Sequence, residues 1–189
     1  MRQQLQRLLA SNTGAVLVVA LGATYVLLLG WLMVSVRFDL WGAAVAAPVV
    51  GFIAIVFVRR FFRDDLSHLR RIALIGLVAK LCGTLTRYWV ANDAYGGASD
   101  ANNYHALGKS FAGGFWQGWV SFVGLVPHTR GTAFIGELTG FIYAFTGSSK
   151  LAGYLWFSLL GFLGVAFCVK AAAVAVPGLL QRRYAWLCF

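Results

Sequence analysis

Four long runs of hydrophobic residues divide this chain, and polar or basic segments separate them. The runs extend from Gly14 to Val36, from Trp41 to about Val58, from Ile72 to about Val90 and from Leu151 to Val169. A transmembrane helix needs about 20 mostly apolar residues, so each run is long enough, or nearly so, to cross a bilayer. The pattern predicts an all-α, polytopic membrane protein with about four spans.

The segment between the third and fourth runs has a mixed character. It predicts two helices that lie along the membrane surface, one over residues 101–116 and ended by Gly113-Gly114, and one over 134–145. The second stretch is too short to span and contains Glu137. A weaker apolar piece covers 119–126, and Gly136-x-x-x-Gly140 predicts a close helix contact. We expect one membrane domain over 1–189, with residues 92–150 forming a loop that carries the interfacial helices.

Composition supports a membrane protein. Hydrophobic residues make up 60% of the chain, charged residues only 12%, and the mean hydropathy is +0.74. Soluble domains are closer to half apolar and a quarter charged. The formal net charge is +10, but the basic residues flank the apolar runs and form no continuous patch. They predict orientation in a bilayer rather than a nucleic-acid partner.

The basic residues also predict the orientation, because cytoplasmic loops are enriched in Lys and Arg. Ten of them fall in the N-terminal tail, the loop after the second run and the segment after the fourth: Arg2, Arg7, Arg59, Arg60, Arg63, Arg70, Arg71, Lys170, Arg182 and Arg183. Placing these segments in the cytoplasm gives a multi-pass protein of the cell membrane with a cytoplasmic N-terminus. The loop over 92–150 then faces outward.

Two basic residues lie inside the third hydrophobic run. Lys80 and Arg87 are seven residues apart, which places them on one face of a helix. A charge at the centre of a membrane helix costs about 2.5–3.5 kcal/mol on insertion scales, so it normally faces protein or a water-filled cavity. The pair predicts a cationic slot for a phosphate or diphosphate. The alternative is snorkelling by Arg87 and a buried ion pair for Lys80.

Two carboxylates follow that run, Asp93 and Asp100. Either could deprotonate an acceptor hydroxyl, and Asp100 could instead hold a divalent metal ion that neutralises a phosphate leaving group. Asp100 also suits the start of the helix that follows, where it would cap the first turn. The further candidates for substrate binding are Tyr104, His105, His128, Arg130 and Glu137. There is no nucleotide-binding glycine motif, no His-Glu-x-x-His and no nucleophile elbow, which argues against an ATPase or a soluble-type hydrolase.

The segment from Asp100 to Trp116 resembles the first outer loop of GT-C class membrane glycosyltransferases, such as protein O-mannosyltransferases and aminoarabinose transferases. The similar features are an aspartate, a tyrosine at Tyr104 and a Gly-aromatic ending, although Ala101 stands where a glutamate is usual. Phe145-Thr-Gly147 through Ala152 is similar to the start of the helix that follows in that class. The resemblance implies a sugar donor on a polyprenyl phosphate, with Asp100 as catalytic base or metal ligand.

We therefore expect a transferase that moves a sugar from a polyprenyl-phosphate donor to a cell-envelope polysaccharide or lipid. The expected partners are this lipid-linked donor, membrane lipids and further packing helices. The alternatives are a polysaccharide polymerase or lipid-linked sugar flippase, and a non-catalytic membrane scaffold subunit. Residues 182–189 resemble the start of another membrane helix, so the chain is expected to be the N-terminal part of a longer protein.

Overall fold

The computed structural model describes residues 2–63, 67–97, 99–118 and 131–175. Within these ranges the regular elements are all helical, and no strand forms, which confirms the predicted all-α fold. The elements are α1 (Arg2–Ser35), α2 (Phe38–Phe61), α3 (Ser67–Trp89), the short π-helix η2 (Val90–Ala94), α4 (Asp100–Trp116), α5 (Thr132–Thr146) and α6 (Lys150–Ala175).

Three helices of the described part are long and apolar enough to cross a membrane: Thr13–Ser35 within α1, all of α2, and α6. They correspond to the first, second and fourth predicted spans. The third predicted span does form a helix, α3, but it carries Arg70, Arg71, Lys80 and Arg87 and is not one of the three. The chain is a helical membrane protein, and α3 is its most polar long helix.

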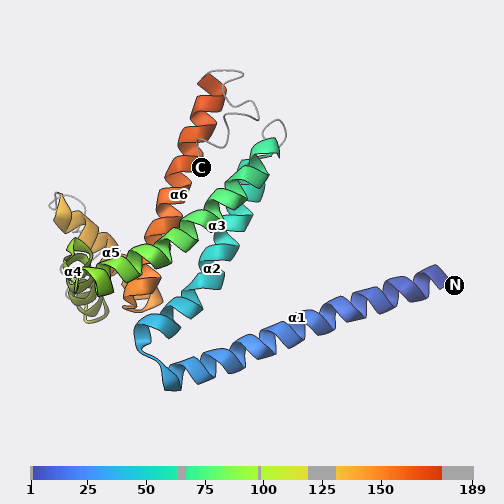
Figure 1. Ribbon diagram of the computed structural model, residues 1–189, viewed down its shortest axis with the longest axis horizontal. Coiled ribbons are helices and arrows are strands. Elements are labelled where there is room, and N and C mark those ends of the chain that lie inside the picture. Colours follow the sequence, from blue (N-terminus) through green and yellow to red (C-terminus); the bar gives the residue numbers. More distant parts are fainter. Residues whose placement is uncertain (1, 64–66, 98, 119–130, 176–189) are drawn as a thin grey trace.

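Helices α2, α3 and α6 pack side by side into a bundle, whereas α1 diverges from it (Figure 1). The core of the bundle contains the fully buried Val50, Val58, Phe62, Leu69 and Phe162. Helix α1 stays attached near its C-terminal half, where the Tyr25 hydroxyl donates to the Ala44 carbonyl at 2.6 Å.

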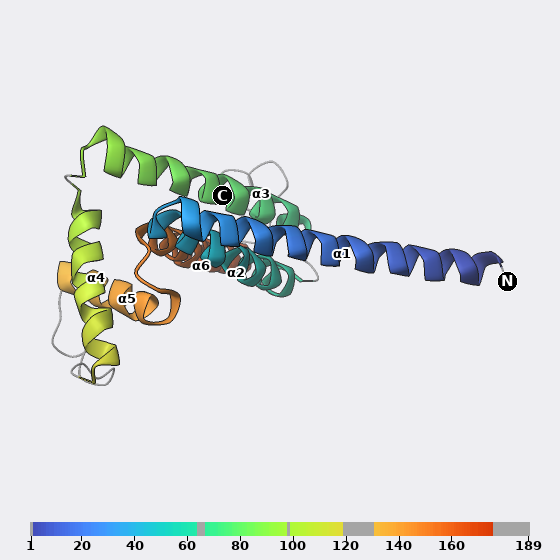
Figure 2. The same ribbon diagram turned by 90° about the horizontal axis from the view of Figure 1, so that it is seen from below.

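One end of the bundle is basic. Arg70 donates to the carbonyl of Phe62, and the Lys170 ammonium lies 4.4 Å from the centre of the Phe61 ring. The end of α2, the start of α3 and the end of α6 therefore meet there, and α4 and α5 lie at the opposite end (Figure 1). In the view of Figure 2, α4 runs across the direction of the bundle helices.

Helices α4 and α5 are in close contact because glycines face larger residues. A methyl group added at Gly140 would lie 2.5 Å from Cβ of Phe111, and one added at Gly108 would lie 2.7 Å from Cγ2 of Thr139. At Gly136 it would lie 2.9 Å from Cβ of Leu107. The predicted close contact at Gly136-x-x-x-Gly140 is confirmed. Helix α4 ends at Trp116, in agreement with the predicted range of 101–116, but the glycine pair at 113–114 does not end it, contrary to the prediction.

Replacing Gly140 with alanine should destabilise the protein, because Cβ of Phe111 is fixed to the backbone and cannot move aside. Overpacking of this kind typically costs about 1–3 kcal/mol, and thermal unfolding in detergent would measure it. Gly113→Ala is the matched control: nothing lies within 4 Å of its added methyl group, and alanine is the better helix former. Equal melting temperatures for the two variants would contradict the close α4–α5 contact.

The N-terminus of α6 is fixed to the start of α2. Ser149 is fully buried; its hydroxyl donates to the Asp39 carbonyl at 2.9 Å and accepts from the Ala152 backbone N–H at 3.1 Å. The Asp39 carboxylate accepts from the Lys150 backbone N–H at 2.7 Å. These contacts satisfy helix N–H groups that otherwise lack partners. They fix the first residue of α6, Lys150, at the end of the bundle where α4 and α5 lie.

Candidate functional site

A cavity of about 310 Å³ lies where α4 and α5 meet α3 and α6. Each of the four helices contributes to its wall. The lining residues among those described are Lys80, Arg87, Ala101, Tyr104, His105, Ile135, Thr139, Tyr143, Lys150, Gly153, Tyr154, Phe157, Ser158 and Gly161.

The cavity follows one face of α6. Its lining residues there recur at i, i+3, i+4, i+7, i+8 and i+11, the spacing of one helix face: Lys150, Gly153, Tyr154, Phe157, Ser158 and Gly161. Gly153 has no side chain to block the Tyr143 ring, which would lie 3.1 Å from an added methyl group. On α3, Lys80 and Arg87 both line the cavity, as their spacing predicts.

The lining is cationic. Lys80, Arg87 and Lys150 contribute three positive charges, and no carboxylate is among the described residues that line the cavity. Within the described part of the chain, neither Lys80 nor Arg87 has an ion-pair partner. The predicted alternative of a buried ion pair for Lys80 is therefore not seen in these residues. Several cations facing one space are suited to an anionic ligand.

Of the three cations, Lys150 is the one whose side chain is held by hydrogen bonds to other described residues. Its ammonium donates to the side-chain oxygen of Asn92 at 2.6 Å and to that of Asn102. Asn92 in turn donates to the Tyr88 carbonyl at 2.7 Å, and Asn102 donates to the Gly97 carbonyl. An ammonium has three donors, so one remains for a ligand. Both partners are neutral amides, which position Lys150 without cancelling its charge.

A histidine–tyrosine pair faces the same space. Nδ1 of His105 lies 2.8 Å from the hydroxyl of Tyr143, and the two rings pack edge to face. Burial is the largest cause that lowers the pKa of His105 below its ordinary value; Lys150 and Lys109 lower it further, and Asp39 partly opposes them. Burial also raises the pKa of Tyr143. Both side chains are therefore neutral at neutral pH and share one hydrogen bond.

The neutral state of His105 makes the stability of the protein depend on pH. Because its pKa is lower in the folded chain than the unfolded value of 6.5, the unfolded chain binds the proton more readily. The stabilisation that comes from keeping His105 neutral is complete above pH 6.5 and is lost as the pH falls through the folded-state pKa. We expect the loss of melting temperature between pH 7.5 and 5.5 to be smaller in His105→Gln than in the wild type. An identical pH dependence in both proteins would contradict this prediction.

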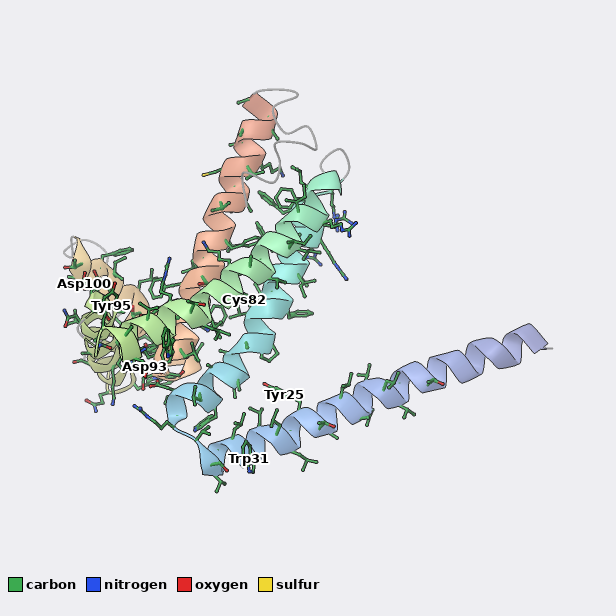
Figure 3. The ribbon with its side chains drawn as sticks, in the orientation of Figure 1. Tyr25, Trp31, Cys82, Asp93, Tyr95 and Asp100 are labelled. Atoms are coloured by element: carbon green, nitrogen blue, oxygen red, sulfur yellow. The ribbon has the colours of Figure 1, made fainter. Side chains whose placement is uncertain are left out.

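The two predicted carboxylates lie beside the cavity and not in its wall. Asp93 is exposed on η2, and Asp100 is exposed as the first residue of α4; Figure 3 labels both at the end of the molecule where α3 passes to α4. The next residue after Asp100, Ala101, does line the cavity. Asp100 does not cap α4, because the N-cap position is Ser99, and neither side chain makes a capping bond. Its charge in the first turn still favours the helix.

The remaining candidates are distributed differently. Tyr104 and His105 line the cavity with Arg87 and Lys80, whereas Glu137 is half-buried on α5 outside the lining. His128 and Arg130 lie outside the described residues, as does the apolar piece over 119–126. Lys150 and Asp39 were not predicted. The sequence feature that could have pointed to Lys150 is its position directly before the fourth apolar run.

A metal ion is not supported by the donor groups at hand. No group of three or more His, Cys, Asp or Glu side chains comes together among the described residues, so Asp100 has no set of protein co-ligands there. Comparison of the chain with models of known protein families, with curated proteins and with solved structures finds no match.

Proposed function

We propose that this chain binds the phosphate of a polyprenyl-phosphate sugar in the cavity and belongs to a GT-C-like membrane glycosyltransferase. The acceptor is a cell-envelope polysaccharide or lipid. One observation carries the proposal: Arg87 and Lys150 face one cavity whose described lining has no carboxylate. Apolar and aromatic residues, Ile135 and Phe157 among them, complete the wall and suit an amphiphilic ligand.

The position of the cavity also suits a lipid-linked ligand. It lies between the apolar helix α6, its more polar neighbour α3, and the pair α4 and α5 at the end of the bundle. In the predicted orientation, the basic end around Arg70 and Lys170 faces the cytoplasm and α4 and α5 lie at the outer surface. A polyprenyl chain can then remain in the bilayer while its phosphate reaches Arg87 and Lys150.

Asp100 is the proposed base. An acceptor hydroxyl attacks the anomeric carbon of the sugar, the bond from that carbon to the phosphate oxygen breaks, and the hydroxyl proton passes to the Asp100 carboxylate. The polyprenyl phosphate leaves as an anion, and Arg87 and Lys150 stabilise the charge that develops on it. The location of Asp100 beside the cavity, one residue before Ala101, supports this role.

The test uses the purified full-length protein in lipid nanodiscs. Polyprenyl monophosphate should bind in a saturable manner. Radiolabelled sugar should be transferred from a polyprenyl-phosphate donor to an acceptor in a membrane extract. Binding without transfer for every donor sugar tried would favour the flippase or scaffold alternatives. Absence of binding would contradict the proposal itself.

A further inference from the structure

The cavity extends much deeper than an interfacial phosphate needs. The Nζ atom of Lys80 lies 3.3 Å from the position that a side chain on Gly161 would occupy. Gly161 follows Lys150 by eleven residues along α6. At 1.5 Å per residue, Lys80 therefore reaches α6 about 17 Å from its first residue. In a hydrocarbon core about 30 Å thick, that is close to the middle of the bilayer.

A cation at that depth is costly, and such residues usually face a functional path. Within the described part of the chain, no carboxylate pairs with Lys80. Its side chain is exposed, and so are Gly161 and the neighbouring Leu160, which is 43% exposed. The absence of a side chain at Gly161 is what leaves room for the ammonium group. The cavity thus has a cation at mid-depth that the proposed transfer chemistry does not use.

Hydroxyl side chains in the cavity wall connect this deep cation with the outer ones. Ser158 lines the cavity, and its hydroxyl is hydrogen-bonded to that of Thr84. Thr84 lies between Lys80 and Arg87 on α3, and Ser158 lies between Lys150 and Gly161 on α6. Hydroxyl groups and cations therefore follow one another along the seam of α3 and α6, from the outer end of the bundle to its middle.

We propose that this seam moves an anionic phosphate headgroup between an outer station at Arg87 and Lys150 and an inner station at Lys80, so that the protein catalyses part of the passage of a phosphate-bearing lipid across the bilayer. The inference rests on the proposed binding of a lipid phosphate but adds a second station and a movement. The lipid tail remains in the bilayer beside the exposed side of the seam, while the cations replace the water that hydrates the phosphate.

The experiment reconstitutes the full-length protein in phosphatidylcholine vesicles that contain a trace of fluorescent polyprenyl phosphate. A membrane-impermeant quencher reports how fast the label changes leaflet. Lys80→Met should slow this movement about tenfold or more, since each 1.4 kcal/mol of lost stabilisation is a factor of ten. The same variant should retain binding at the outer station within about twofold. Lys170→Met, which changes a lysine of α6 outside the cavity, is the matched control and should move the lipid at the wild-type rate.

Four results would overturn the inference. Wild-type protein that binds the lipid but does not speed its movement would leave the proposed function intact and remove the second station. Lys80→Met that moves the lipid at the wild-type rate would exclude Lys80, and equal loss of binding and movement would show a single site. Inorganic phosphate carries the same anionic group as the lipid and could use the same cations. A second experiment therefore measures the release of inorganic phosphate trapped in the vesicles. Release of phosphate without movement of the lipid would also contradict the proposal.

Discussion

Asp100→Asn is expected to reduce sugar transfer by about two to four orders of magnitude, the range that a positioned acid or base contributes. The amide keeps the size and shape of the carboxylate but cannot accept the proton of an acceptor hydroxyl. Asp100 is exposed and lines no part of the cavity, so binding of polyprenyl phosphate should remain at the wild-type level. Transfer of radiolabelled sugar and binding of the unlabelled lipid, measured on the same preparation, separate the two effects.

Asp93→Asn shows which of the two carboxylates at this end of the molecule acts as the base. Asp93 lies on η2, and Asp100 lies on α4 beside the cavity lining, so the larger loss is expected at Asp100. A large loss at Asp93 alone would transfer the role of base to that residue. Wild-type transfer by Asp100→Asn would contradict the proposed chemistry, and the folded state of each variant is checked by its melting temperature.

The helices were predictable because their signals are local. Long apolar runs gave α1, α2 and α6, and the seven-residue spacing of Lys80 and Arg87 placed both on the face of α3 that lines the cavity. The Gly136-x-x-x-Gly140 pattern gave the close contact of α5, although its partner, Phe111 of α4, is not encoded in that motif. The predicted range of α4, 101–116, agrees with the structure, but the expectation that Gly113-Gly114 end the helix was wrong, because glycines inside a packed helix need not adopt a turn conformation; the positive φ occurs at Gly118, beyond the last helical turn.

The contacts of the cavity were not predictable, because they join residues far apart in the chain. Asp39 and Lys150 are separated by 111 positions, and His105 and Tyr143 by 38. No periodicity or motif links such pairs in one sequence. The location of Asp100 relative to the cations has the same origin: the sequence places it after α3, but only the packing of α4 shows that Ala101, Tyr104 and His105 face the cavity while Asp100 does not.

The three cations of the cavity differ in how they are held, and this assigns them different roles. The Lys150 side chain is fixed by two amide oxygens, whereas no hydrogen bond to another described residue holds the side chain of Lys80 or Arg87. A fixed cation loses little side-chain entropy when a ligand binds, so it contributes more to affinity than a free one. Lys150 is therefore the main anchor of the phosphate in the proposed site, although the sequence pattern pointed to Arg87 and Lys80.

Lys150→Met should weaken the binding of polyprenyl monophosphate about 10- to 100-fold, since hydrogen bonds to charged groups are worth roughly 1.5–3 kcal/mol. The methionine keeps much of the length of the side chain but donates no hydrogen bond to a phosphate oxygen. Lys150→Arg, which preserves the charge, should retain most of the affinity. Lys109→Met removes an exposed lysine of α4 outside this cavity and is the matched control for net charge. Binding by Lys150→Met at the wild-type level, in protein with a wild-type melting temperature, would show that the phosphate is anchored elsewhere.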